Sequence, residues 1–394
     1  MQYTPRSNQL HIGLFGKRNS GKSSLINAIT RQNTAIVSDV PGTTTDPVRK
    51  SMELQGIGAC VLIDTPGIDD SGELGEMRVK QTLRVTHQVN IAIMVCSDVH
   101  IDQEYEWSKK LDAKGIPVVW LINKCDLLTT TDDIKQEIEK RYGQSPIIVS
   151  AFTRKGIDFL LQKIRDIASD TTTPCIVSKT LANQGDTVML VMPQDNQAPK
   201  GRLILPQVQT IRELLDRKCL VMSCTTDQID NMLHTLNRPP KLIITDSQAF
   251  KTVYDKKPEE SKLTSFSILF AKQKGDIDYY MQSARCISRL NETSHVLIAE
   301  ACTHVPDTED IGRIKIPLLL RKHAGEHLHI DHVSGNDFPE DLSQYDLIIH
   351  CGACMFNRQY VLQRISQARR QHIPMTNYGV AIAFLSGIID KIDY

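Results

Sequence analysis

The segment Gly16–Ser23 has the sequence Gly-Lys-Arg-Asn-Ser-Gly-Lys-Ser, which matches the spacing G-x-x-x-x-G-K-S. It follows an apolar segment and precedes a helix-like one, which is the context that such a loop requires. The glycines allow backbone N–H groups to face phosphate oxygens, Lys22 can neutralise the β- and γ-phosphates, and Ser23 can offer its hydroxyl to Mg²⁺. The sequence therefore predicts a nucleotide-binding loop (P-loop) with contacts from Ser20, Gly21, Lys22, Ser23 and Ser24.

A carboxylate follows the next strongly apolar segment, in Asp64–Gly67 (Asp-Thr-Pro-Gly). At the end of a strand, Asp64 can reach Mg²⁺ through water, and Gly67 can present its N–H to a γ-phosphate. We therefore expect Ser23 and Asp64 to hold Mg²⁺, and Lys22 and Gly67 to take part in catalysis.

A run of three threonines, Thr43-Thr44-Thr45, lies between these two motifs. Nucleotide-dependent switch loops place a threonine over Mg²⁺ and the γ-phosphate at this point of the chain. The sequence leaves open which of the three does so. Thr44 is the candidate for a catalytic role, and Thr45 is a candidate nucleotide contact.

Two later motifs predict recognition of the base. In Asn123–Asp126 (Asn-Lys-Cys-Asp), the carboxylate of Asp126 can accept hydrogen bonds from N1–H and the 2-amino group of guanine, which adenine lacks. A buried carboxylate left unpaired costs several kcal/mol, so ATP should be rejected. Ser150 and Ala151 end the following apolar segment, where a backbone N–H can contact guanine O6. The expected contacts in these two motifs are Asn123, Lys124, Asp126, Ser150 and Ala151.

These motifs together resemble those of the translation-factor-related GTPases, and within them the Era-like and tRNA-modification GTPases. The resemblance implies that Asn19 helps to bind K⁺ beside the phosphates. Ile68 stands where Ras-like proteins have a glutamine that orients water, so another group must do this. By the same resemblance Glu73 and Glu76 are candidates, with Glu76 taken as catalytic. A solvated acidic loop is the alternative interpretation of both.

Cysteine and histidine cluster in two segments of the C-terminal third, Cys302-Thr303-His304 and His350–Cys354 (His-Cys-Gly-Ala-Cys). Each follows an apolar, strand-like segment, and the carboxyl ends of parallel strands meet at one edge of a sheet. The C-x-x-C spacing allows two thiolates to bind one metal ion or two irons of a cluster. Buried core cysteines are the alternative interpretation, and it is the one we adopt for the other seven cysteines.

The elements that position these residues alternate as strand and helix, which predicts an α/β fold with a parallel-rich sheet in a P-loop G domain, followed by two further α/β domains. The expected strands of the first domain are His11–Phe15, Ala59–Ile63, Ile91–Cys96, Pro117–Ile122 and Ile147–Ser150. Those of the second are Thr187–Met192, Cys219–Met222 and Lys241–Thr245, and those of the third are Ser265–Phe270, His295–Ala301, His329–Val333 and Asp346–His350. The charged stretch 255–262 indicates a linker or exposed turn. The expected domains are residues 1–173, 174–262 and 263–394.

Composition excludes several classes of protein. The 394 residues include 46 basic and 46 acidic side chains, so no charge excess indicates nucleic acid or membrane as a partner. The polar N-terminus is unlike a signal peptide, and no apolar run is long enough for a transmembrane helix. We expect a cytoplasmic protein in which most of the ten cysteines remain thiols, and those that cluster are candidates for metal binding.

A G domain followed by C-x-H and H-C-x-x-C resembles the HydF family, the maturation GTPases of iron-only (FeFe) hydrogenase, over essentially the whole chain. The resemblance implies a GTPase domain, a dimerisation domain and an iron–sulfur domain. It also implies a 4Fe–4S cluster on Cys302, Cys351 and Cys354, with His304 and His350 as possible further ligands and a fourth iron position that is open or weakly held. Radical-SAM maturases and apo FeFe-hydrogenase are the partners that it implies, and GTP or GDP, Mg²⁺ and K⁺ are the other cofactors.

Two other functions fit parts of the sequence. An Era-like GTPase that acts on RNA would carry a basic appended module, and the balanced charge weighs against one. A zinc-stabilised regulatory GTPase would use the three cysteines and a histidine as a closed tetrahedral site. Iron content would separate this last function from a cluster scaffold.

Overall fold

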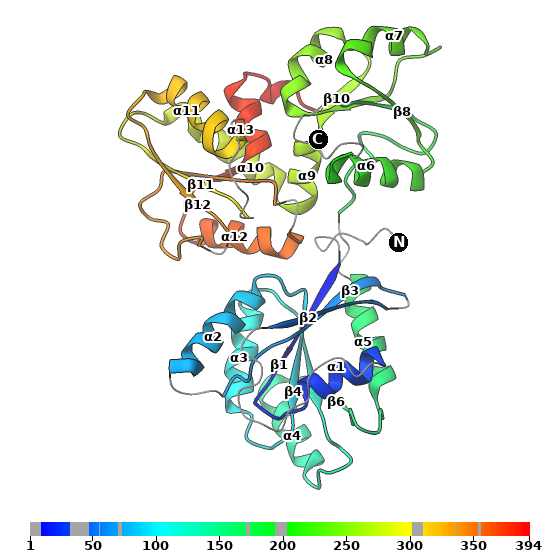
Figure 1. Ribbon diagram of the computed structural model, residues 1–394, viewed down its shortest axis with the longest axis vertical. Coiled ribbons are helices and arrows are strands. Elements are labelled where there is room, and N and C mark those ends of the chain that lie inside the picture. Colours follow the sequence, from blue (N-terminus) through cyan, green and yellow to red (C-terminus); the bar gives the residue numbers. More distant parts are fainter. Residues whose placement is uncertain are drawn as a thin grey trace. The chain divides into compact units, whose positions relative to one another are not determined.

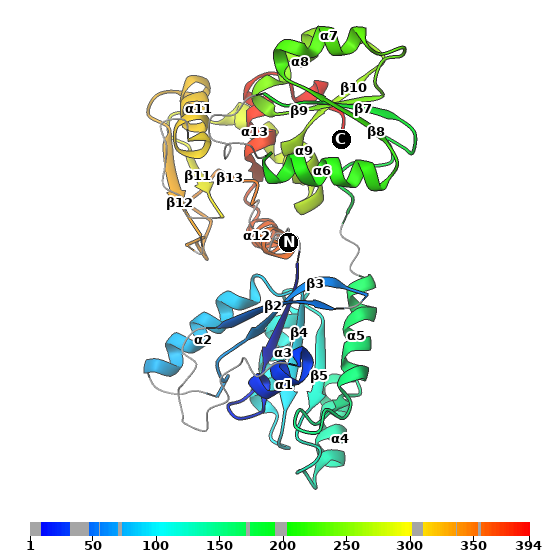
Figure 2. The ribbon, with the colours of Figure 1, turned by 45° about the vertical axis from the view of Figure 1, so that its right-hand side comes forward.

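The computed structural model describes residues 9–31, 47–54, 56–69, 73–170, 174–193, 203–301, 310–335, 337–353 and 356–394. The chain forms two compact units, Met1–Thr172 and Thr173–Tyr394. Within the described residues the first unit has one sheet and the second has two, as Figures 1 and 2 show. None of the described helices combines the length and the apolar character that a membrane crossing needs.

The sheet of the first unit has the strand order β2-β3-β1-β4-β5-β6. Its strands are β1 (Leu10–Phe15), β2 (Val48–Leu54), β3 (Gly58–Asp64), β4 (Ile91–Cys96), β5 (Val118–Ile122) and β6 (Ile147–Ile148). All neighbours pair in parallel except β2, which is antiparallel to β3 at the edge of the sheet. The central strands β4 and β5 consist of apolar residues because helices cover both of their faces.

In the described part of this unit, five helices cover the sheet: α1 (Lys22–Thr30), α2 (Glu73–Thr86), α3 (Asp102–Asp112), α4 (Thr131–Tyr142) and α5 (Ile157–Asp170). The side chains of α1 and α5 join one core with Ile12 and Leu62, and those of α2, α3 and α4 join a second core with Phe15 and Met94. The helices thus fix the parallel strands from two sides. As a result, the loops after β1, β3, β5 and β6, which contain the sequence motifs, gather at the same edge.

The second unit contains a middle sheet of order β10-β9-β7-β8, all parallel. Its strands are β7 (Thr187–Val191), β8 (Leu220–Cys224), β9 (Leu242–Thr245) and β10 (Lys262–Ser265). The helices around it are α6 (Leu205–Asp216), α7 (Ile229–His234), α8 (Phe250–Lys256) and α9 (Phe266–Lys274), with short 3₁₀ turns η2 (Thr226–Gln228) and η3 (Ser247–Ala249).

The third sheet has the order β12-β11-β13-β14 and is also parallel. Its strands are β11 (His295–Ala299), β12 (His329–Val333), β13 (Leu347–His350) and β14 (Met375–Asn377). Its helices are α10 (Ile277–Ala284), α11 (Ile316–Ala324), α12 (Arg358–Arg370) and α13 (Tyr378–Leu385), with the short turns η4 (Arg285–Arg289), η5 (Ile311–Lys315) and η6 (Ile389–Lys391). Figure 1 shows α12 on one face of this sheet and α11 and α13 on the other.

The strand predicted at Ser265–Phe270 is wrong, because this segment forms helix α9. Ser265 caps the helix, and its side chain accepts a hydrogen bond from the N–H of Ile268. The first six residues of the helix are apolar apart from Ser267, and they pack into two cores: Phe266, Leu269 and Phe270 join one, and Ile268 and Ala271 join the other. Because this run places apolar side chains toward both cores, it lacks the 3.6-residue alternation of apolar and polar residues that identifies a helix in a sequence.

Strand β10 crosses the expected boundary between residues 262 and 263, since it begins at Lys262 and pairs with β9 as far as Ser265. The charged stretch before it is a tight turn between α8 and β10. Within this turn Lys257 Nζ donates hydrogen bonds to the carbonyls of Pro258, Glu259 and Ser261. The stretch therefore connects helix α8 to strand β10 of the middle sheet.

Candidate functional site

The first candidate site lies at the carboxyl edge of the N-terminal sheet. Strand β1 ends at Phe15, the segment Gly16–Gly21 turns sharply, and α1 begins at Lys22. Gly16 has φ +146°, and a Cβ there would lie 2.3 Å from the carbonyl oxygen of Val95. Gly21, at φ +93°, is the N-cap of α1. The predicted P-loop therefore leads into the positive end of a helix dipole, which favours a phosphate group.

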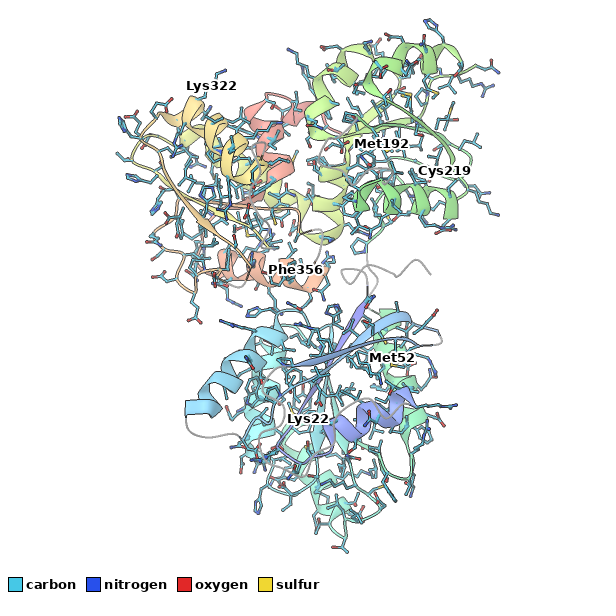
Figure 3. The ribbon with its side chains drawn as sticks, viewed as in Figure 1. Lys22, Met52, Met192, Cys219, Lys322 and Phe356 are labelled. Atoms are coloured by element: carbon cyan, nitrogen blue, oxygen red, sulfur yellow. The ribbon has the colours of Figure 1, made fainter. Side chains whose placement is uncertain are left out.

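Lys22, labelled in Figure 3, lies in the first turn of α1 and is buried. Its Nζ donates hydrogen bonds to the carbonyls of Gly16, at 2.9 Å, and Lys17, at 2.8 Å. The loop thus holds the ammonium group over its own backbone. Ser20 Oγ is also buried, and no described residue gives it a hydrogen-bond partner. Both polar groups are suited to phosphate oxygens.

Ser23 and Asp64 form a hydrogen-bonded pair at the expected magnesium site. Ser23 Oγ donates to Asp64 Oδ2 at 2.5 Å, while no described residue hydrogen-bonds to Asp64 Oδ1. Burial raises the pKa of Asp64, and the bond from Ser23 and the charge of Lys22 act in the opposite direction. A buried carboxylate oxygen without a partner costs free energy unless a cation compensates it. The pair therefore fits a bound Mg²⁺.

The loop after β3 is bonded to the P-loop. The N–H of Ile68 donates to the Gly16 carbonyl at 3.3 Å, and the N–H of Arg18 donates to Asp69 Oδ1 at 2.6 Å. A Cβ on Gly67 would lie 2.8 Å from Asp69 Oδ1 and 3.0 Å from the Arg18 nitrogen, so a side chain at this position would push against the P-loop. Ile68 is buried in the core and has no polar atom that could orient water.

Asn123 connects the phosphate and base motifs. Its Nδ2 donates to the carbonyl of Ser20 at 3.0 Å, and its Oδ1 accepts from the N–H of Ala151 at 3.0 Å. The side chain is 1% exposed. A Cβ on Gly21 would lie 2.2 Å from Asn123 Nδ2, so the P-loop glycine makes room for this bridge. Predicted as a nucleotide contact, Asn123 also holds two loops in register.

The base motifs surround this bridge. Lys124 has a left-handed backbone at φ +63°, and its carbonyl accepts the N–H of Leu127 at 2.8 Å, so the segment turns outward. Asp126 is exposed, as a group that receives a ligand from solvent must be. Ser150 is fully buried, and its Oγ accepts from the N–H of Thr153 at 3.0 Å. These bonds shape the loops that would present Asp126 and the Ala151 backbone to guanine.

For the other predicted residues of the nucleotide site the structure describes the backbone and exposure of two and leaves the side chains of the rest undescribed. Asn19 is exposed with a left-handed backbone at φ +57°, and Ser24 lies half-buried in α1. Thr44 and Thr45 lie outside the described residues. Glu73 and Glu76 begin helix α2, and their side chains also lie outside the description.

Lys17 forms ion pairs that the sequence analysis did not predict. Its Nζ lies 3.4 Å from Asp98 Oδ1 and 3.7 Å from Glu104 Oε2, and it also donates to the carbonyl of His100. Burial raises the pKa of Glu104, and Lys17 acts in the opposite direction. This ion pair connects the P-loop to the segment after β4. Because partners more than eighty residues apart leave no local pattern, no sequence signal could have indicated it.

The second candidate site lies at the carboxyl ends of β11 and β13, which pair in parallel with Ala299 opposite His350. The N–H of Cys351 donates to the Ala299 carbonyl at 2.9 Å. Cys351 Sγ then accepts two backbone hydrogen bonds, from Ala301 at 3.0 Å and from Ala353 at 3.4 Å. Such N–H donors stabilise a thiolate over a thiol.

The two donors are sequence neighbours of the other expected thiolate ligands. Ala301 directly precedes Cys302, and Ala353 directly precedes Cys354. Cys302, His304 and Cys354 themselves lie outside the described residues. Among the residues that the structure describes, no three His, Cys, Asp or Glu side chains gather as a metal site. The geometry of Cys351 nevertheless fits a sulfur ligand whose partners come from both loops.

His350 is fully buried, and both of its ring nitrogens have partners. Nδ1 lies 2.6 Å from the carbonyl of Cys351, and Nε2 lies 2.8 Å from Nη1 of Arg364. Burial, followed by the charge of Arg364, lowers the pKa of His350 to about 3. In this arrangement neither nitrogen is available to a metal, although His350 was a possible ligand.

Lys274 braces the second loop and was not predicted. It is buried at the end of α9, and its Nζ donates to the carbonyls of Ala353, at 2.8 Å, and Phe356, at 2.9 Å. Phe356, labelled in Figure 3, lies just before α12. The two carbonyls flank Cys354 in sequence. The ammonium group therefore fixes both ends of the segment that contains this cysteine.

Comparison with known proteins gives matches along most of the chain. Residues 11–124 match the family model described as 50S ribosome-binding GTPase. Residues 176–275 match the hydrogen maturase F dimerization domain, and residues 278–392 match the hydrogen maturase F tetramerization domain. The segment that we expected to be an iron–sulfur domain thus matches a family model that is named a tetramerization domain. The two later domains are therefore oligomerization domains.

The N-terminal unit is similar to GTPases of other families. GTPase Der of Wolinella succinogenes is 32% identical over 166 residues, which are 40% of this chain and 35% of that protein. The tRNA modification GTPase MnmE of Moorella thermoacetica is 33% identical over 162 residues, again 40% and 35%. The chain thus spans about a third of the length of these curated relatives. A solved structure of an S. thermophilus NFeoB variant bound to GDP and AlF4⁻ is 24% identical, with a TM-score of 0.34, over 41% of this chain and 65% of that one.

The order of these matches agrees with the geometry of the two sites. The P-loop and the Ser23–Asp64 pair lie in the segment that matches a GTPase, and the first base motif begins at its end with Asn123, so the N-terminal domain is a GTPase domain. The two hydrogen maturase F domains follow in order and together cover most of the second unit, residues 176–275 and 278–392. The chain therefore belongs to the hydrogen maturase F (HydF) family.

Proposed function

We propose that this chain is a GTP-hydrolysing scaffold that holds a 4Fe–4S cluster and carries a diiron precursor to apo FeFe-hydrogenase. Membership of the HydF family supports the role in hydrogenase maturation. The observation that carries the cluster site is the geometry of Cys351, whose Sγ accepts N–H groups from the residues that precede Cys302 and Cys354.

For the nucleotide, we infer roles that follow from the site geometry. The P-loop N–H groups and Lys22 bind the phosphates, while Ser23 and Asp64 hold Mg²⁺, which shields the charge of the phosphate oxygens. Gly67 presents its N–H to the γ-phosphate, and Asp126 selects guanine. The Asn123 bridge keeps the two ends of the nucleotide site at a fixed separation.

Hydrolysis requires a group that orients water, and Ile68 cannot supply it. We propose Glu76, in the first turn of α2, for this role, with Thr44 closing over the γ-phosphate and Thr45 contacting the nucleotide. Asn19 would bind K⁺ beside the phosphates. Its exposed position at the turn of the P-loop leaves its side chain accessible to an ion.

For the cluster, we propose three thiolate ligands, Cys302, Cys351 and Cys354. Three thiolates leave one iron with an exchangeable position, where the cluster can attach a precursor. His304 remains a candidate for this position. His350 supports the site through its bond to the Cys351 carbonyl, since both of its ring nitrogens are engaged.

The partners that we propose are the radical-SAM maturases and apo FeFe-hydrogenase, and the compartment is the cytoplasm. A homodimer through the middle domain is the assembly we favour, and the name of the last domain adds a tetramer as a second assembly. We propose no nucleic-acid or membrane partner.

Iron and sulfide analysis of anaerobically reconstituted protein tests the cluster. About four irons and four sulfides per chain are expected, with loss of both in Cys351→Ser. Cys286→Ser is the matched control, because Cys286 is a half-buried cysteine outside the two motifs. Stoichiometric zinc without sulfide would show a zinc-stabilised GTPase in place of a scaffold.

A further inference from the structure

Arg364 on α12 is a buried cation near the proposed cluster site. It is 5% exposed, and its guanidinium donates to Nε2 of His350, to the carbonyl of Gly335 and to the hydroxyl of Tyr360. It also lies over the rings of Phe338 and Tyr360, 4.6 and 4.4 Å from their centroids. Every one of these partners is electrically neutral.

No carboxylate of the described residues forms an ion pair with Arg364. Burial accordingly lowers the pKa of this guanidinium, while Tyr360 and Cys351 act in the opposite direction. Arg369, on the same helix, shows the usual arrangement: it is half exposed and paired with Asp276 at 2.6 Å. A buried charge without a counter-ion is strongly unfavourable, and aromatic rings compensate it only in part.

A chain of hydrogen bonds leads from Arg364 to Cys351. Arginine can only donate, so His350 Nε2 must be the acceptor in this bond. The ring proton therefore lies on Nδ1, which donates to the carbonyl of Cys351 at 2.6 Å. The sulfur of the same residue accepts the N–H groups of Ala301 and Ala353. The positive charge thus acts on a residue whose sulfur is already arranged to carry negative charge.

We propose that the anion that compensates Arg364 is the thiolate-ligated iron–sulfur cluster, and that Arg364, acting through His350, is a positioning residue that makes the cluster easier to reduce. This inference rests on the proposed function. Thiolate-ligated clusters are anionic, and reduction adds one negative charge, which a nearby buried cation stabilises. Arg364 would therefore favour the reduced state and also favour loading of the cluster over the empty site.

The test compares Arg364→Met and Arg364→Gln, which remove the charge, with Arg364→Lys, which retains it. Arg369→Met is the control on the same helix. EPR-monitored redox titration of reconstituted full-length protein should show the equilibrium constant for reduction falling at least tenfold in both neutral variants, which is about 59 mV for one electron. Arg364→Lys should recover most of this change, and the control should match wild type.

A second measurement follows thermal unfolding with and without the cluster. The gain in Tm on cluster loading should be smaller in the two neutral variants than in wild type, because they remove the buried charge that no described carboxylate pairs. Equal potentials and equal gains in cluster-loaded variants would overturn this inference and leave the proposed function intact. Failure of wild type to bind iron and sulfide would overturn both.

Discussion

Replacing Asn123 with alanine should separate the phosphate loop from the base loop. The change removes two buried hydrogen bonds, to the Ser20 carbonyl and from the Ala151 N–H. A buried polar group left without a partner costs about 1–3 kcal/mol. Ala151 is only half-buried, so water can satisfy part of the loss. We therefore expect the N-terminal domain to lose ~2–4 kcal/mol of stability.

The effect on nucleotide binding should be distinct from the effect on stability. In wild type the bridge fixes the distance between the groups that bind phosphate and guanine, so binding does not have to order them. Asn123→Ala should weaken both GTP and GDP by roughly 10- to 100-fold, or about 1.4–2.8 kcal/mol. The two nucleotides should lose affinity equally, because the bridge does not contact the γ-phosphate motif.

Titration calorimetry with GDP and a non-hydrolysable GTP analogue, together with thermal unfolding, measures both quantities. Asn90→Ala is the matched control: Asn90 Oδ1 accepts a bond from the His11 N–H at 2.9 Å, at the opposite end of β1 from the P-loop. This control should lose stability without losing affinity. Wild-type nucleotide affinity in a folded Asn123→Ala protein would refute the proposed role of the bridge.

Three further predictions concern single groups. Asp126→Asn should weaken GTP binding on the order of 100-fold or more and favour xanthosine triphosphate, since an amide replaces the acceptor that faces guanine; competition binding would measure this, and unchanged GTP affinity would remove Asp126 from the site. GTP turnover should be several-fold faster in K⁺ than in Na⁺, and Asn19→Ala should abolish the difference; equal wild-type rates in both salts would contradict it. Lys274→Met should release iron to a chelator roughly tenfold faster, because the loop beside Ala353 loses its brace; unchanged release kinetics would show that the brace is unimportant.

The fold of the N-terminal domain could be predicted because its motifs follow strands that are apolar on both faces. Each motif then marks the carboxyl end of a strand, and parallel strands bring those ends together. Strand β2 escaped prediction since it is an antiparallel edge strand with a largely exposed, polar pattern. Helix α9 was mistaken for a strand because its apolar residues serve two cores at once.

The residues proposed to contact the nucleotide could be predicted more completely than the hydrogen bonds and ion pairs that hold their loops in place. Motif spacing identified Lys22, Asp64 and Asn123, because each motif has a fixed relation to a strand end. The same spacing could not reveal that Asn123 joins Ser20 to Ala151, or that Lys17 reaches Glu104. Such contacts depend on how distant loops meet, which local pattern does not encode.

For Cys351, the hydrogen bonds around the sulfur distinguish a metal ligand from a buried core cysteine. Cys60 is a buried residue of β3, and burial raises the pKa of its thiol to about 12, so it stays neutral as a core side chain does. Cys351 is only half-buried, and two backbone N–H groups point at its sulfur. A core thiol needs no such donors, whereas a thiolate ligand does. The arrangement therefore supports a metal-ligating role for Cys351, and the loss of iron and sulfide in Cys351→Ser but not in Cys286→Ser is the result that this reasoning requires.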